Sequence, residues 1–150
     1  MNRVSQNELI GTVAIQSALE NSTERRLSLA KTMLVLPLLF DRIIRSVLKR
    51  KNSIVLSSKD LLISNPNAFV TLRTRYEDLT ITSLNTILLA QELGMATLEN
   101  DHLVLKKRIF LQENLQIGKI ASDILASGPK LALILGENTA DLYQTFRIEL

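Results

Sequence analysis

The chain has 150 residues, of which 46% are hydrophobic and 22% are charged, and it contains no cysteine. This length predicts a single domain that buries its own core, and the lack of cysteine excludes disulfides, thiol nucleophiles and thiolate zinc sites and predicts a cytoplasmic location. The 18 Lys and Arg residues against 15 Asp and Glu residues give a net charge of +3, which permits contact with nucleic acid without requiring it.

The most apolar stretch, residues 32–40, is too short to cross a membrane. It is bounded by Lys31 and Asp41 and interrupted by Pro37, whereas a membrane-spanning helix needs about 20 apolar residues. Residues 1–8 are polar, so we expect no secretory signal. The stretch is therefore predicted to be core, and a membrane is not expected as a partner.

The first helix is predicted over residues 7–19, where apolar and small residues recur near a period of 3.6. Residues 21–23 should break it, and a hydroxyl residue there can cap a second helix. That helix should stop or kink near Val35, because Pro37 has no amide hydrogen and disfavours a helical conformation of the residue before it.

A third helix is predicted from Leu38, with one apolar face and one basic face. Residues 54–56 after it are expected to form an extended link or a brief strand. The helix and the residues that follow it place five positive charges within ten residues: Arg42, Arg45, Lys49, Arg50 and Lys51.

Three helices are predicted in the middle of the chain, over residues 59–64, 67–79 and 83–93, with a turn around Pro66. The third of them should begin after Thr80 or Thr82. Its predicted inward positions are Leu84, Ile87, Leu88 and Leu93.

Gly94 should end that helix, and residues 96–99 and 102–106 are predicted to pair as a hairpin around Asn100 and Asp101. Two helices followed by a glycine and a hairpin are typical of a winged helix. A helical domain that merely carries a hairpin is the alternative.

The last third is again predicted to be helical, ending at a Ser-Gly-Pro break over residues 127–129. Short helices should follow over residues 130–135 and 140–145. The apolar stripe before the break is Leu115, Ile117, Ile120, Ile124 and Leu125, and a terminal strand is indicated by Phe146, Ile148 and Leu150.

These elements predict a mainly α protein, a helical domain that contains a winged-helix-like helix-turn-helix and a short β-hairpin. One domain is expected over residues 1–150. Its winged-helix-like part should span about 58–107, with helical flanks over 7–50 and 112–146.

Catalytic chemistry is disfavoured by the residues available for it. His102 is the one histidine and is predicted to lie on the hairpin, so every scheme that needs an imidazole base depends on it. Glu77 and Asp78 are the one adjacent acidic pair, and adjacent side chains on a helix point in different directions. The five glycines form no phosphate-binding loop. We therefore expect no enzyme activity, cofactor, metal or small-molecule substrate.

A second basic cluster, Lys106, Lys107 and Arg108, follows the hairpin. Both clusters fit three interpretations: contacts with DNA phosphates, contacts with an acidic protein, or plain solvated surface. The presumptive recognition helix, residues 83–93, disfavours reading of base edges, because it carries no Lys or Arg.

Several segments resemble the middle components of bacterial three-component systems built around an SMC-like or Rad50-like ABC ATPase, including the small subunit of Lamassu-type defence systems. Residues 34–40 (LVLPLLF), followed by Arg45 and Leu48, are similar to an apolar signature of that family. Residues 58–69 (SKDLLISNPNAF) and 76–98 resemble its following helices and hairpin, and Leu135 with Gly136 match more weakly. Lys49, Arg50 and Lys51 depart from the family pattern, which has a proline there.

The resemblance implies a non-catalytic subunit that binds the ABC ATPase and links it to an effector, often a nuclease, in defence against phages and plasmids. DNA would be reached through the complex. Docking is predicted near residues 34–40 and the hairpin, although core is the alternative role for the candidate anchors: Leu36, Pro37, Leu38, Phe40 and Phe110.

A function from another class stays open as the alternative: a free-standing winged-helix transcriptional regulator that binds DNA. That protein would bind a specific DNA sequence by itself, and its affinity would fall steeply with salt. A hydrolase or nuclease is the least favoured class.

Overall fold

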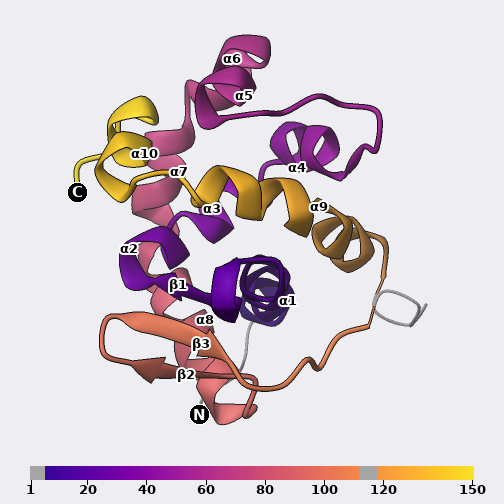
Figure 1. Ribbon diagram of the computed structural model, residues 1–150, viewed down its shortest axis with the longest axis vertical. Coiled ribbons are helices and arrows are strands. Elements are labelled where there is room, and N and C mark those ends of the chain that lie inside the picture. The colour runs from indigo at the N-terminus through magenta and orange to yellow at the C-terminus, as the bar shows by residue number, and fades with distance from the viewer. Residues whose placement is uncertain (1–5, 112–117) are drawn as a thin grey trace.

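The computed structural model describes residues 6–111 and 118–150, and it confirms a mainly α fold with a small antiparallel sheet. In Figure 1 the first helix, α1 (Gln6–Glu20), is seen nearly end-on at the centre of the molecule. The other elements follow in chain order: η1 (Thr23–Arg25), β1 (Arg26–Ser28), α2 (Leu29–Thr32), α3 (Val35–Leu39), α4 (Arg42–Lys49), α5 (Ser58–Ser64), α6 (Pro66–Phe69), α7 (Leu72–Asp78), α8 (Thr80–Glu92), β2 (Ala96–Glu99), β3 (His102–Leu105), α9 (Lys119–Leu135) and α10 (Thr139–Thr145).

Helix α1 is enclosed by its neighbours, with every residue from 11 to 19 buried. It packs against α9, α8, α3 and the sheet. Glycines allow two of these contacts to be very close. A Cβ atom added at Gly11 would lie 2.7 Å from Oγ1 of Thr86 on α8, and one added at Gly128 on α9 would lie 2.9 Å from the carbonyl oxygen of Ser17.

The predicted break at residues 127–129 is wrong, because α9 runs without interruption from Lys119 to Leu135 and contains Pro129. Pro129 has no amide hydrogen for the carbonyl of Leu125, four residues earlier. The hydroxyl of Ser17 on α1 lies beside this point of α9, with its Oγ 3.0 Å from the Ile124 oxygen and 3.4 Å from the Leu125 oxygen. A side chain of α1 thus contacts the backbone of α9 next to its proline, and the predicted helix at 130–135 is the second half of α9.

The predicted second helix is also wrong over its first half. Glu24 and Arg25 have φ values of 57° and 55°, in the left-handed region, so the chain forms a short 3-10 turn there and then the strand β1. The expected break before Pro37 is present, between α2 and α3. Pro37 lies in the first turn of α3, where its missing amide hydrogen costs no helical hydrogen bond.

The sheet has the order β1-β3-β2, with both pairs antiparallel. The predicted hairpin is confirmed, with Gly94 at φ 73° after α8 and Asn100 at φ 58° in the turn. This order of elements along the chain is compatible with a winged helix. The extent of the winged-helix-like part, 58–107, stays a prediction, but the sheet also includes β1 from outside that range.

Some further expectations differ from the structure. The predicted helix at 67–79 is divided into α6 and α7. Residues 54–56 form a link rather than a strand, which is one of the two alternatives predicted for them. The last residues form no strand: Arg147 has φ 57°, and the amide of Ile148 donates to the carbonyl of Tyr143, which caps α10. In the apolar stripe predicted over residues 115–125, Ile120 is exposed and Ile124 and Leu125 are buried within α9, whereas Leu115 and Ile117 lie outside the described residues.

One buried amide ties the chain after the sheet to α1. The Oε1 atom of Gln16 accepts hydrogen bonds from the backbone amides of Ile109 (2.7 Å) and Phe110 (2.8 Å). Its Nε2 atom donates to the carbonyl oxygen of Phe110 at 2.7 Å. The fully buried side chain therefore satisfies the hydrogen-bonding capacity of three backbone groups in the segment that follows β3.

We expect Gly128→Ala to lower the free energy of unfolding by about 1–3 kcal/mol, the usual cost of overpacking a core. The added methyl group would collide with Ser17 of α1. Chemical denaturation measures this change. Gly136→Ala is the matched control at the end of the same helix, where the nearest atom lies 3.3 Å away; an equal loss in both variants would contradict the close contact.

Gln16→Leu should lower the free energy of unfolding by about 2–4 kcal/mol, because an apolar side chain of similar size leaves three backbone groups without their partners. Amide hydrogen exchange at Ile109 and Phe110 should accelerate at the same time. Gln91→Leu, at a half-buried glutamine of α8, provides the control. Unchanged exchange at residues 109 and 110 in Gln16→Leu would argue against the anchoring role of Gln16.

Candidate interaction surfaces

The structure places most of the predicted docking anchors inside the protein. Leu36 and Leu38 are 0% exposed and Pro37 is buried with them in α3. Phe40 and Phe110 are half-buried and pack against the same core. In the isolated chain, residues 36–38 therefore offer no side-chain surface to a partner.

The first predicted basic cluster lines a groove between α4 and the beginning of α9, which we call the α4 groove. Its volume is about 630 Å³, and apolar side chains, including Ile43, Val47 and Ile120, form part of its lining. Its charged lining residues are Arg42, Arg45, Lys49, Arg50, Lys119 and Asp123. Lys51 is exposed directly after α4 and its C-cap residue.

Among the residues that the structure describes, Asp123 is the one carboxylate that lines the α4 groove, and two lysines share it. Its Oδ2 atom lies 3.3 Å from Nζ of Lys49, and its Oδ1 atom lies 3.4 Å from Nζ of Lys119. Arg45 is directed elsewhere, because it donates to the carbonyl oxygen of Leu39 at 2.9 Å. Arg42 and Arg50 are exposed, so the groove keeps a net positive charge that suits phosphate groups or carboxylates.

A lysine that sequence reasoning missed fixes the loop beside this groove. Lys130 of α9 donates to the carbonyl oxygen of Arg50 and to the carbonyl and hydroxyl oxygens of Ser53, the latter two at 2.8 and 2.6 Å. A cation at the end of α4 also suits the negative end of the helix dipole. No local sequence pattern links residue 130 to residues 50–53.

The second basic cluster is largely neutralised by ion pairs. Nζ of Lys106 lies 2.6 Å from Oε2 of Glu99, and Nε of Arg108 lies 2.6 Å from Oε2 of Glu20. The hydrogen bond and the charge of Lys106 lower the pKa of Glu99 below its usual range. Lys107 is exposed and forms no ion pair within the described residues. The cluster therefore presents less free positive charge than its sequence indicates.

The prediction of which side of α8 faces the core is wrong. Ile87 is buried as expected, but Leu84, Leu88 and Leu93 are exposed by 46, 57 and 42%. The residues that face the interior are mostly small: Ser83, Thr86, Ile87 and Ala90. Small side chains are needed there because α1 approaches α8 closely at Gly11.

The outward side of α8 is therefore apolar, and we call Ile81, Leu84 and Leu88 the α8 face. Ile81 is 67% exposed. The charged residues of the surrounding segment are of one sign, since residues 77–105 contain five acidic residues and no Lys or Arg. Asp78, the last residue of α7 and two positions before α8, and Glu92, the last residue of α8, are exposed.

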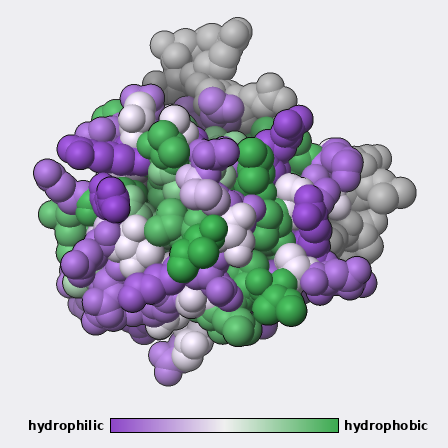
Figure 2. Space-filling model, turned by 90° about the horizontal axis from the view of Figure 1, so that it is seen from above, coloured by the Kyte–Doolittle hydropathy of each residue, from purple (hydrophilic) through white to green (hydrophobic). Residues whose placement is uncertain are grey.

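Other exposed apolar side chains lie near the end of the molecule that carries α5 and α6. Seen from that end, apolar patches interrupt a largely hydrophilic surface (Figure 2). Ile54, Leu56, Ile63 and Val70 are all more than 70% exposed. Three of the four belong to connecting segments rather than to a helix, so they form no continuous helical stripe.

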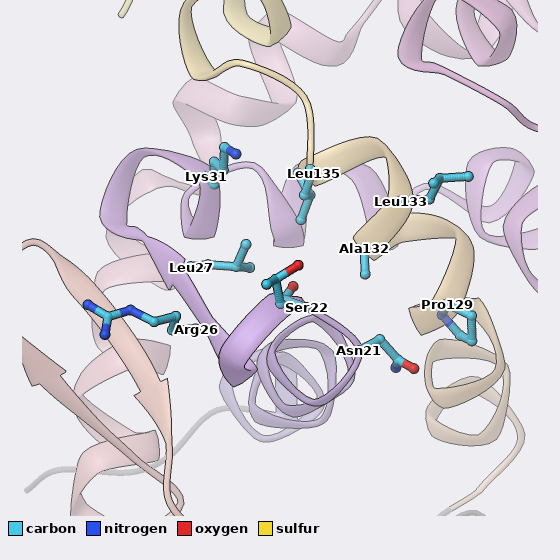
Figure 3. Close-up of a pocket in the computed structure, with 11 residues that line it drawn as sticks. Asn21, Ser22, Arg26, Leu27, Lys31, Pro129, Ala132, Leu133 and Leu135 are labelled. Carbon is cyan, nitrogen blue, oxygen red and sulfur yellow. The ribbon is translucent and has the colours of Figure 1, made fainter.

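A second cavity, of about 500 Å³, lies where α1 ends near β1 and α9. Figure 3 shows Asn21 and Ser22 at the end of α1, with Ala132 and Leu135 of α9 across the cavity. Arg26 and Lys31 are the cations that line it, and burial lowers the pKa of Lys31, an effect partly offset by the charge of Glu137. The lining combines these two cations with apolar, amide and hydroxyl side chains.

Within residues 6–111 and 118–150, no group of three or more His, Asp or Glu side chains is arranged to hold a metal ion. His102 lies half-buried on β3. None of the helices in this part of the chain has the length and apolar character needed to cross a bilayer.

Comparison with curated proteins and with solved structures gave no match. A family model, described as ABC-three component (ABC-3C) system Middle Component 3, matches residues 4–150. This range covers nearly the whole chain, including both the α4 groove and the α8 face. The chain therefore belongs to the family of middle components of ABC-three component systems.

Proposed function

We propose that this middle component is a non-catalytic adaptor in the cytoplasm. It binds the SMC-like or Rad50-like ABC ATPase of its system and links that ATPase to an effector, such as a nuclease, in bacterial defence against phages and plasmids. Family membership supports the existence of partner components.

The observation that carries the proposal is the separation of two unlike surfaces on one small domain. The α4 groove is basic, whereas the α8 face is apolar with acidic ends. In Figure 1, α4 lies at the upper right, while the strands that follow α8 lie at the bottom. Two surfaces that differ in charge and in position can hold two different partners at the same time.

The α4 groove is the surface we assign to DNA held by the complex, with an acidic segment of a partner as the competing ligand. Flexible cationic side chains contact phosphates with little sequence preference. Helix α8, which the sequence predicts as the recognition helix, is apolar and acidic on its exposed side, and this opposes base reading by the isolated chain. This disfavours the free-standing transcriptional regulator.

Co-expression with the ABC ATPase and the effector tests the adaptor role. The affinity-purified chain should retain both components, and size-exclusion chromatography with light scattering should give one complex that contains all three. The chain alone should show weak, sequence-independent DNA binding. Tight binding of one DNA sequence by the isolated chain, with no retention of either component, would instead support the regulator.

Arg42→Glu combined with Arg50→Glu should weaken DNA binding by the assembled complex, because both side chains are exposed at the α4 groove. The slope of log affinity against log salt should become shallower by roughly 2, about one unit for each lost phosphate contact. Fluorescence anisotropy with labelled duplex DNA measures both quantities. Lys59→Glu, an exposed lysine on α5, is the control; an equal effect there would remove the groove from the proposal.

A further inference from the structure

We infer that the α8 face docks an amphipathic helix of a partner component, one whose apolar stripe is flanked by lysine or arginine. The inference deepens the proposed function and rests on it only in assigning that helix to a partner component. Its support comes from the geometry of α8 and from the charges around it.

The α8 face has the spacing of a helix-docking stripe. Ile81, Leu84 and Leu88 are separated by three and four residues, so they lie along one side of α8. Their exposed fractions are 67, 46 and 57%. Apolar side chains with this periodicity are the anchors by which an amphipathic helix and its receptor surface recognise each other.

The helix that carries this stripe packs closely against the core on its opposite side. Its inner side contacts α1 through small residues, and Thr86 sits directly against Gly11. The outer side chains are thus presented by a helix of 13 residues whose position is fixed by the core. A preformed surface of this kind loses little conformational entropy when a partner binds.

Charge complementarity identifies the occupant. Asp78 precedes α8 and Glu92 ends it, four residues after Leu88. Neither carboxylate forms an ion pair among the described residues. A partner helix lying along the stripe would therefore meet negative charge near both ends, which favours lysine or arginine at the corresponding positions.

The same charges disfavour two other occupants. A second copy that paired its own α8 face with this one would bring Asp78 and Glu92 close to like charges. DNA would be repelled by the carboxylates and would find no Lys or Arg between residues 77 and 105.

A pair of synthetic helical peptides tests the recognition chemistry on the purified full chain. Both peptides carry the same leucine stripe, but one has lysines beside it and the other has glutamates. Fluorescence anisotropy should show binding of the lysine peptide at least tenfold tighter than that of the glutamate peptide, with the difference shrinking as salt rises. Equal binding of the two peptides, or binding of neither, would overturn the inference.

Leu84→Arg should weaken binding of the lysine peptide at least 30-fold, because it replaces an anchor by a like charge. Leu133→Arg is the matched control, since Leu133 is a leucine of α9 with a similar exposed fraction, 55%. Circular dichroism and thermal melting establish that both variants fold. If Leu84→Arg folds and binds the peptide as the wild type does, the α8 face is not the binding site.

The co-expressed complex separates this inference from the proposed function. Release of one component by Leu84→Arg, but not by Leu133→Arg, would support docking on α8. A complex that forms equally well with both variants would overturn the α8 inference and leave the adaptor role intact. If the wild-type chain retains no component, the adaptor role fails, and the peptide measurement alone decides on α8.

A wild-type dimer that Leu84→Arg dissociates would assign the face to a second copy and overturn the inference.

Discussion

Helix α1 is enclosed between α8 and α9, and at Gly11 and Gly128 its contacts are so close that one added methyl group would collide with a neighbour. This close packing determines which side of each neighbouring helix faces inward. It requires small residues on the inner side of α8 and therefore turns Leu84 and Leu88 outward. It also brings Ser17 to the backbone of α9, where its hydroxyl stabilises a helix that contains a proline.

The two candidate surfaces differ in how the chain builds them. The α4 groove combines side chains from α4 and α9, which are far apart in sequence, and Asp123 holds two of its lysines in place. The α8 face consists of one helix, and its charge comes from a continuous segment, residues 77–105, that has no basic residue. A net charge of +3 for the whole chain conceals this separation, because the excess of positive charge lies elsewhere.

Local signals predicted those parts of the fold that depend on neighbouring residues. Gly94 and the Asn100–Asp101 turn indicated the hairpin, and the segments from residue 34 onward indicated the family that the family model shows. Contacts between distant residues decided the rest. The strand β1 needs β3 as its partner, α9 packs its proline region against Ser17 of α1, and the phase of α8 depends on Gly11. Leucine periodicity alone assigned the wrong side of α8 to the core, and Lys130 had no signal that pointed to its role beside the α4 groove.

Gln16 joins the centre of the molecule to its surface. Its amide holds Ile109 and Phe110 through three hydrogen bonds, and these residues follow directly after the exposed Lys107 and the ion-paired Arg108. The backbone there cannot move away from α1 without breaking all three bonds together. The segment that follows β3 is thus fixed to α1, and a displacement of this segment would be transmitted directly to the innermost helix.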